Sequence, residues 1–328
     1  MSVLVLTDAE IERLLSVADC IPIMVSALTS LARGEAEQPL RLVVQPDRAP
    51  GFLAVMPAYV GGADAAFGLK AVGVFNGNVA LGKDSHQGSV TLYDGMTGEL
   101  LALMNASVIT AIRTAAVSGV ATKLLARADA GVLAIIGSGV EARTHLMAMS
   151  AVRTLREVRV AGRDAAKAQA FAEAMRSRVD APIRVATSIE DAVRGADLVV
   201  TVTNSSEPVL RREWVADGAH INAVGAALRT TRELDSATVA ASRLFVDRRE
   251  STQNESGDYL IPLADGVIKD DHIRGELGEL LLGTVAGRGS DDEITLFKSL
   301  GLAVEDLATA RWLFDRAKAE GVGTSVDF

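Results

Sequence analysis

The fold is decided by the stretch Gly131-Val132-Leu133-Ala134-Ile135-Ile136-Gly137-Ser138-Gly139-Val140-Glu141-Ala142. Its first six residues form an apolar run rich in β-branched side chains, which is typical of a buried parallel strand. Gly137, Gly139 and Ala142 then follow in the spacing GxGxxA, and a helical pattern continues to about Val152. A dinucleotide-binding motif requires this order of strand, glycine turn and helix. The stretch therefore predicts a dinucleotide site of Rossmann type rather than a purely structural turn.

The small residues of this motif have separate physical tasks. Gly137 permits the tight turn after the strand, and Ala142 lets the helix pack close to the strand. Gly139 has no Cβ, so a pyrophosphate can approach the backbone and the helix N-terminus. The candidate residues for binding the cofactor at this turn are Gly137, Ser138, Gly139, Val140 and Glu141.

The end of the next strand indicates which dinucleotide is bound. This strand covers residues 157–161 and leads into Gly162-Arg163-Asp164, about where NAD-binding proteins carry an acid for the ribose hydroxyls. An arginine there can pair with the 2′-phosphate of NADP, so we favour NADP(H). Asp164 keeps NAD(H) open, because a small shift in alignment would restore an acid. Arg163 could also be a solvated residue at a helix start.

Composition narrows the class of protein. The chain has 328 residues, of which 49% are hydrophobic but only 4% aromatic, so its cores must be built from aliphatic side chains. The net charge is −9 and no run of Lys or Arg occurs, which argues against a nucleic-acid-binding protein. We therefore expect a small-molecule partner, with any anionic substrate met by local arginines or lysines.

Several other features are expected to be absent. The single cysteine, Cys20, cannot form an intramolecular disulfide and is expected in the core. The N-terminus lacks a basic region, and no segment reaches about 18 apolar residues without a break, so we expect a cytoplasmic protein without a membrane span. The chain has four histidines and no HxH, HExxH or CxxC, so we expect no metal site.

The remaining elements suggest two domains. A capping box at Thr7 and Glu10 opens a first helix, and a second helix is expected from about residue 21 to 33. Further strands are expected at 41–44, 52–56, 67–75, 89–94 and 99–104, which gives an antiparallel-rich sheet in the first hundred residues. A long helix at 107–127 leads into the glycine motif. Beyond the motif, strands alternate with helices, which implies a mostly parallel sheet with Gly137, Thr203 and Gly225 around one crevice.

Several long strings also match a known family. They are Val55-Met56-Pro57-Ala58-Tyr59, Ser85-His86-Gln87, residues 108–116, residues 137–142, residues 220–226, Glu255-Ser256-Gly257-Asp258 and Phe297-Lys298-Ser299-Leu300-Gly301. With these strings the chain resembles the ornithine cyclodeaminase/mu-crystallin family, and is most similar to its mu-crystallin (ketimine reductase) branch. The resemblance implies an α/β protein in which a Rossmann-type doubly wound parallel sheet, residues 107–301, is inserted into a second α+β domain. That second domain, residues 1–106 with 302–328, would bind substrate and build a homodimer.

The resemblance also assigns roles to single residues. Family members carry out NAD(P)-dependent chemistry at the Cα–N bond of amino acids, so a substrate α-carboxylate needs a cationic clamp. Arg41, Lys70 and Arg113 match the clamp, with Lys70 a candidate proton donor and Arg113 near the nicotinamide as well. His86 is a second candidate acid, although a structural histidine fits the sequence about as well. The remaining residues expected to contact the cofactor are Ser85, Thr203, Asn204, Val224, Gly225, Lys298 and Ser299.

One departure separates the chain from part of the family. Cyclodeaminases and archaeal alanine dehydrogenases carry an aspartate shortly after the glycine that matches Gly225, and here the position is Ala227. Glu233 follows six residues later and is not expected to substitute for it. The chain is therefore expected to be an NAD(P)H-dependent reductase of imines derived from α-keto acids. The alternatives are an ornithine-type cyclodeaminase or amino-acid dehydrogenase, and a non-enzymatic ligand-binding protein of mu-crystallin type.

Overall fold

The protein is described by a computed structural model that covers residues 2–327. The chain forms two compact units. Unit 1 comprises Met1–Arg113 and Gly301–Phe328, and unit 2 comprises Thr114–Leu300. Helix α3 (Ala106–Leu125) begins in unit 1 and ends in unit 2, so the residue at which the chain changes unit, Arg113, lies inside a helix.

Unit 1 is built on a sheet of eight strands in the order β16-β1-β7-β6-β5-β4-β2, with β3 paired to β4. Only the β1–β7 pair is parallel. The strands are β1 (Ser2–Leu6), β2 (Ala36–Glu37), β3 (Leu42–Val44), β4 (Phe52–Val60), β5 (Ala66–Val74), β6 (His86–Asp94), β7 (Leu100–Asn105) and β16 (Thr324–Asp327). The helices are α1 (Asp8–Leu14), α2 (Val17–Ala32), the 3-10 helix η1 (Asn76–Leu81) and α11 (Ala303–Glu320).

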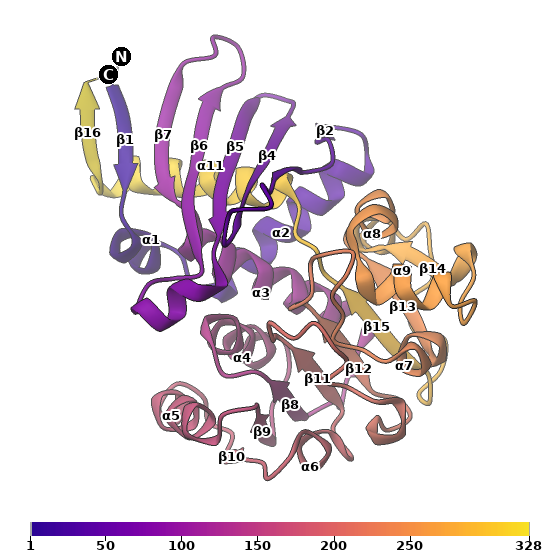
Figure 1. The fold of residues 1–328 in the computed structure, drawn as a ribbon. Coiled ribbons are helices and arrows are strands. Elements are labelled where there is room, and N and C mark those ends of the chain that lie inside the picture. The colour runs from indigo at the N-terminus through magenta and orange to yellow at the C-terminus, as the bar shows by residue number, and fades with distance from the viewer. Residues whose placement is uncertain (1, 328) are drawn as a thin grey trace. The chain divides into compact units, whose positions relative to one another are not determined.

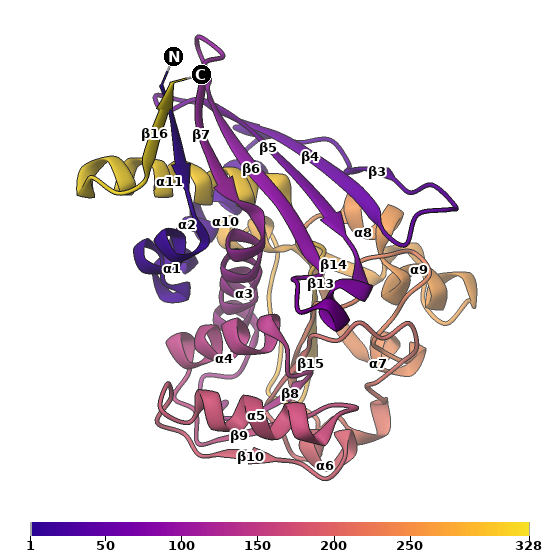
Figure 2. The same cartoon turned by 60° about the vertical axis from the view of Figure 1, so that its left-hand side comes forward.

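One face of this sheet is covered by helices. Helix α11 lies across β4, β5 and β6 and packs against α2 (Figures 1 and 2). Alternate residues of the strands point under these helices, as Met56, Val90 and Met104 show by their burial. Lys70 is in register with Met56 and Val90, so the pleat directs its side chain to the same covered face. A charged residue of the sheet is therefore held under a helix.

Unit 2 has a sheet of eight strands that are all parallel, in the order β10-β9-β8-β11-β12-β15-β13-β14. Its strands are β8 (Val132–Ile136), β9 (Glu157–Ala161), β10 (Ile183–Val185), β11 (Leu198–Thr201), β12 (His220–Ala223), β13 (Ser242–Val246), β14 (Ile273–Glu276) and β15 (Ile294–Lys298). Its helices are α4 (Val140–Val152), α5 (Ala165–Met175), α6 (Ile189–Val193), α7 (Ser236–Ala241), α8 (Arg249–Glu255), α9 (Gly257–Ala264), α10 (Leu277–Leu282), η2 (Arg212–Trp214) and η3 (Asp270–His272). The doubly wound parallel sheet expected from the sequence is confirmed.

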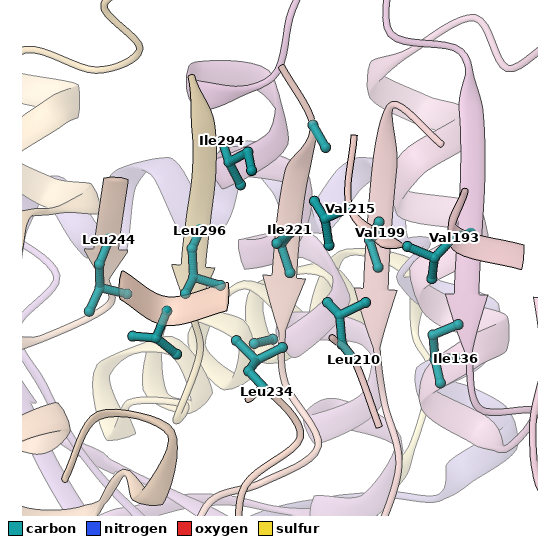
Figure 3. Packing of buried hydrophobic residues seen from close by; sticks show 14 of the residues in the cluster. Ile136, Val193, Val199, Leu210, Val215, Ile221, Leu234, Leu244, Ile294 and Leu296 are labelled. Atoms are coloured by element: carbon teal, nitrogen blue, oxygen red, sulfur yellow. The ribbon is translucent and has the colours of Figure 1, made fainter. Parts of the chain in front are cut away.

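The core of unit 2 is mainly aliphatic, and it also contains the buried rings of Phe171, Phe245, Tyr259 and Phe297. Figure 3 shows Ile136, Val199, Ile221, Leu296 and Leu244 side by side on neighbouring strands, where they pack against residues of α6 and of the loops. The strand order reverses between β8 and β11, because the chain winds outward through β9 and β10 and then returns. In such sheets ligands bind at the carboxyl ends of the strands beside the reversal. We therefore expect a nucleotide to bind beside the residues that follow β8 and β11.

Some elements differ from the expectations. Strands β1, β2, β14, β15 and β16 were not predicted, and β15 lies inside the unit 2 sheet between β12 and β13. Helix α2 begins at Val17 instead of about Ile21, because Ser16 caps it by accepting a hydrogen bond from the Asp19 amide. The capping box of α1 is present as predicted, with Thr7 N donating to Glu10 Oε2 over 2.8 Å.

Within residues 2–327, one helix is long and apolar enough to cross a membrane when judged by length and composition alone. It is α3, and the bent pair α1 and α2 passes the same test if it is counted as one span. Of the most apolar window of α3, 78% is buried inside the protein, as is also usual for the core helix of a folded domain. The test is therefore weak evidence for a membrane span.

Candidate active site

The turn after β8 has the geometry that a dinucleotide motif needs. Gly137 adopts φ +125°, and a Cβ there would lie 2.6 Å from the carbonyl oxygen of Val202, which follows β11. Only glycine fits this turn, because the left-handed backbone and the neighbouring strand both exclude a side chain. The turns after β8 and β11 thus lie in contact at the reversal of the strand order.

Helix α4 begins directly beyond this turn. Gly139 is its N-cap, and apart from the adjoining chain no atom lies within 4 Å of the position where a Cβ would stand. The free amide groups at the start of a helix and its dipole attract anions, so an open, glycine-lined N-terminus fits a pyrophosphate. Ser138 and Val140 border the opening, and Glu141 lies in the first turn, where its Oε2 is 3.5 Å from Nδ1 of the buried His145.

Two charged residues after β9, Arg163 and Asp164, bear on the choice between NADP(H) and NAD(H). Asp164 is the N-cap of α5, where its Oδ1 accepts hydrogen bonds from the amides of Ala166 and Lys167. Arg163 is exposed and donates from Nη2 to Asn204 Oδ1 over 3.0 Å. Gly162 has open space around it. The carboxylate of Asp164 is therefore engaged in capping, whereas the guanidinium of Arg163 reaches the loop after β11.

A buried carboxylate joins the loops after β11 and β12. Glu233 Oε1 accepts from Thr203 N (2.6 Å) and Thr203 Oγ1 (2.7 Å), and its Oε2 accepts from Thr201 Oγ1 (2.8 Å) and Gly225 N (2.7 Å). Gly225 lies so close that a Cβ would be 2.1 Å from the Thr203 carbonyl oxygen. Gly137 lies beside Val202, and Glu233 binds Thr203 and Gly225 together, so the three residues expected around one crevice follow neighbouring strands of the sheet.

Lys298 is held within unit 2 by a second buried pair. Its Nζ lies 2.9 Å from Asp258 Oδ2 and donates to the carbonyl oxygen of Ala226 over 2.6 Å. Asp258 Oδ1 accepts from the amides of Glu233 and Leu234. The pair therefore supports the loop after β12 from beneath, next to Val224 and Gly225. Ser299 is also buried, and its amide donates to the carbonyl oxygen of Ala223.

In unit 1, Lys70 is buried and forms an ion pair with Asp306 of helix α11. Its Nζ lies 3.2 Å from Asp306 Oδ1 and 3.3 Å from Oδ2. Burial lowers the pKa of Lys70 from 10.5 to about 8, the nearby Asp306 opposes this shift, and Arg113 and Arg41 add to it. Lys70 is thus a cation that can release a proton near neutral pH.

Arg113 lies on α3 and shares the same acidic partner. Its Nε donates to Asp306 Oδ1 over 3.0 Å, and its Nη1 donates to Glu305 Oε2 over 3.0 Å. All four side chains are almost completely buried. Two cations and two carboxylates from β5, α3 and α11 therefore form one charge-balanced group, which we call the unit 1 cluster: Lys70, Arg113, Glu305 and Asp306.

Arg41 joins this cluster through the backbone of Gly301. Arg41 Nη2 donates to the Gly301 carbonyl oxygen over 3.2 Å. Gly301 has φ +78°, and a Cβ there would lie 2.4 Å from Arg113 Nη1. The absence of a side chain at this position lets the Arg113 guanidinium lie against the backbone. The structure thus brings Arg41, Lys70 and Arg113 together within unit 1, as the clamp requires.

His86 and Ser85 lie at the start of β6. His86 Nδ1 is 3.1 Å from Ser85 Oγ. Although the residue is exposed, the protein atoms around its ring, followed by the positive charges of Lys70 and Arg113, lower the pKa of His86. The ring is therefore mainly neutral at neutral pH, so little imidazolium is present there to donate a proton.

Three acids of these sites were not anticipated in their observed roles. Glu305 and Asp306 were not predicted, because two acids in the first turn of a helix are also the usual partners of the helix dipole. Glu233 was considered only as a base, and in the structure both of its oxygens accept hydrogen bonds from the cofactor loops. Among residues 2–327, no group of three or more His, Cys, Asp or Glu side chains is arranged to hold a metal ion.

The chain is similar in sequence and fold to several known proteins. It is 43% identical over 298 residues to the mouse (Mus musculus) ketimine reductase mu-crystallin, covering 90% of this chain and 91% of that protein. The structure of Thermococcus litoralis Delta(1)-pyrroline-2-carboxylate reductase in complex with NADH and L-proline matches with a TM-score of 0.96 and 41% identity, covering 98% of this chain and 100% of that one. An archaeal alanine dehydrogenase dimer with bound NAD matches with a TM-score of 0.94 and 33% identity, over 100% of both chains.

A family model gives the same result over most of the chain. The model of the ornithine cyclodeaminase/mu-crystallin family matches residues 1–321. The match includes both units, the glycine motif and the unit 1 cluster. The resemblance seen in the sequence is thereby confirmed, and this protein belongs to the ornithine cyclodeaminase/mu-crystallin family.

Proposed function

We propose that this protein is an NAD(P)H-dependent reductase of imines and ketimines of α-keto acids, which it converts to amino or cyclic imino acids. The observation that carries the proposal is the gathering of Arg41, Lys70 and Arg113 in unit 1. The ketimine reductase and pyrroline-2-carboxylate reductase relatives support the reaction class. The glycine turn and open α4 N-terminus of unit 2 support the nucleotide.

The chemistry divides between the cofactor and the side chains. When bound, the reduced nicotinamide supplies a hydride to the imine carbon, and one proton from the protein or solvent completes the amine nitrogen. Arg41 and Arg113 would hold the α-carboxylate, since a guanidinium matches a carboxylate with two parallel hydrogen bonds. Lys70 would share its proton with the imine nitrogen, because a pKa of about 8 suits a general acid at neutral pH.

The loop after β12 supports reduction over cyclodeamination. By the resemblance, members that deprotonate a substrate amine carry an aspartate where this chain has Ala227. Glu233 cannot easily replace that base, because it is buried and both oxygens accept hydrogen bonds from Thr201, Thr203 and Gly225. Reduction of a preformed imine has no need for such a base.

We propose NADPH as the preferred reductant. Asp164 caps helix α5 and is thereby drawn away from a ribose, while Arg163 extends over the loop after β11 to Asn204. A guanidinium in this place favours the doubly charged 2′-phosphate. The NAD-bound structures of relatives make NADH the second candidate.

We propose that the active form is a homodimer that buries the open face of the unit 1 sheet. The strand register places Leu42, Val44, Leu53, Phe67 and Leu103 on the face opposite α11, and all five are exposed. Large apolar side chains exposed on one sheet face are typical of a protein interface, and the matching archaeal alanine dehydrogenase is a dimer. Light scattering should give twice the chain mass, and a Phe67→Lys variant should shift it toward monomer.

The direct test is an oxidation assay with NADPH and NADH. Preformed cyclic imines such as pyrroline-2-carboxylate and piperideine-2-carboxylate should be compared with iminosuccinate and with keto acids plus ammonia or methylamine. The proposal expects nucleotide oxidation that depends on an imine with an α-carboxylate. A protein that quenches nucleotide fluorescence but reduces no imine of the panel would instead be a binding protein.

A further inference from the structure

The carboxylate of Asp306 is the common partner of both buried cations in the unit 1 cluster. Its Oδ1 accepts from Lys70 Nζ over 3.2 Å and from Arg113 Nε over 3.0 Å, and its Oδ2 lies 3.3 Å from Lys70 Nζ. The three residues come from α11, β5 and α3, so the carboxylate fixes two side chains of separate elements in one arrangement.

The neighbouring acid has a different partner. Glu305 Oε2 accepts from Arg113 Nη1 over 3.0 Å and so forms an ion pair with the guanidinium. Both acids lie in the first turn of α11, where the helix dipole favours negative charge. The two residues therefore share burial, helix position and contact with Arg113, and they differ in the contact with Lys70.

A buried ammonium group is costly unless an anion lies beside it. Lys70 faces Asp306 from α11, Arg113 from α3 and Arg41 from the segment before β3, and the ring of His86 on β6 lies within its field. Of these groups only Asp306 is an anion. Without it, the remaining carboxylate of the unit 1 cluster is Glu305, which pairs with Arg113, so the buried Lys70 would lose its anionic partner and give up its proton more readily.

We infer that Asp306 is a positioning residue of the imine-reducing site, which holds the Lys70 ammonium beside the Arg113 guanidinium and keeps the Lys70 nitrogen protonated. The role of Asp306 in imine reduction rests on the function proposed above, whereas its effect on the protonation of Lys70 can be measured without any reaction. Asp306 acts through Lys70 and Arg113 and has no bond to make or break itself.

The sign of the effect follows from the groups around Lys70. Burial lowers the pKa of Lys70 to about 8, and Asp306 raises it both by its charge and by its hydrogen bonds, while Arg113 and Arg41 lower it. Removing the charge of Asp306 removes the raising influence and leaves the lowering ones. The pKa of Lys70 must then fall further, and the proton is lost at a lower pH.

The experiment compares Asp306→Asn with Glu305→Gln, which neutralises the adjacent buried acid. Lysine labelled with 13C at Cε would be titrated by NMR, with the Lys70 signal assigned by its loss in Lys70→Met. We expect the Lys70 titration of Asp306→Asn to move down by at least about one pH unit, a tenfold change in the proton affinity. In Glu305→Gln it should move much less. The alkaline fall of kcat/KM for imine reduction should move with the NMR titration in each variant.

Two results would overturn the inference. One is a Lys70 titration that is unchanged in Asp306→Asn, and the other is an equal shift in both variants, which would mean a general charge effect. If the unmodified protein reduces no imine but its Lys70 titrates as expected, the proposed reaction fails and the role of Asp306 in protonation stands.

A second variant covers the case in which Asp306→Asn does not fold. The pair Lys70→Met with Asp306→Asn removes both charges, and replacing a buried pair is tolerated far better than removing one partner. A folded double variant beside an unfolded Asp306→Asn supports the inference, because the defect is then the unpaired Lys70. If both fail to fold, Asp306 serves the fold independently of Lys70 and the inference is wrong.

Discussion

The replacement of Glu233 by glutamine tests how the nucleotide loops are held. The carboxylate accepts four hydrogen bonds of 2.6–2.8 Å, two at each oxygen. In Glu233→Gln one oxygen becomes an NH2 group. A threonine hydroxyl can turn and accept from it, but the amide groups of Thr203 and Gly225 can only donate. Whichever way the new amide is turned, one of these two backbone N–H groups faces an NH2 group: the Thr203 N–H then loses its acceptor, or the Gly225 N–H keeps only its longer bond of 3.2 Å to the Thr201 carbonyl oxygen.

The cost can be worked from these contacts. A buried donor without a partner costs about 1–3 kcal/mol, and the bonds at the remaining oxygen lose their charge assistance. We expect the two effects together to lower the free energy of unfolding by roughly 3 kcal/mol, which corresponds to a fall in Tm of roughly 6–12 °C for a domain of this size. Because the loops after β11 and β12 are then less well held, the Kd for NADPH should rise by about tenfold or more, as 1.4 kcal/mol changes an equilibrium tenfold.

The assay combines thermal unfolding with fluorescence titration of NADPH. The matched control is Glu213→Gln, an exposed glutamate of the same unit, which should leave both quantities unchanged. An unchanged Tm and Kd in Glu233→Gln would refute the reasoning, since the four hydrogen bonds would then contribute nothing. Unchanged nucleotide binding with a loss of imine reduction above a hundredfold would refute it in another way, because Glu233 would then be an acid of the reaction.

The other predictions concern the cofactor, the clamp and the reaction type. Arg163→Ala should raise the KM for NADPH and leave that for NADH nearly unchanged, and an unmodified enzyme that uses NADH better would mean that Arg163 was wrongly assigned. In the unmodified enzyme kcat/KM for imine should fall as the pH rises through about 8, because the Lys70 ammonium is present below this pKa and lost above it. Lys70→Met should lower kcat/KM tens- to thousands-fold, for a loss of about 2–5 kcal/mol, while nucleotide still binds, and a fully active variant would exclude Lys70 from the mechanism. Ornithine should not be converted to proline at a rate comparable to imine reduction, since Ala227 provides no base, and product analysis with catalytic NAD would show the contrary.

Local patterns account for what was predicted correctly. The apolar strand, the glycine turn and the helix of residues 131–152 are adjacent in the chain, so their order and spacing can be read locally, although the close approach of Val202 to Gly137 comes from another strand. The parallel sheet follows from the alternation of strands and helices for the same reason. Strand β15 was missed because its middle position depends on pairing with β12 and β13, more than 45 residues away, and because Thr295 and Lys298 give it polar positions that are nevertheless buried.

The sequence alone determined the fold class, the family and the types of residue that meet a carboxylate and a dinucleotide. It could not reveal that Lys70 and Asp306, 236 residues apart, share one buried ion pair, or that Glu233 ties the loops after β11 and β12 together. An acid in the first turn of a helix has the same local pattern whether it faces water or a buried lysine. Only the packing of α11 on β5 decides between the two, because burial turns a weak surface contact into a strong interaction that sets a pKa.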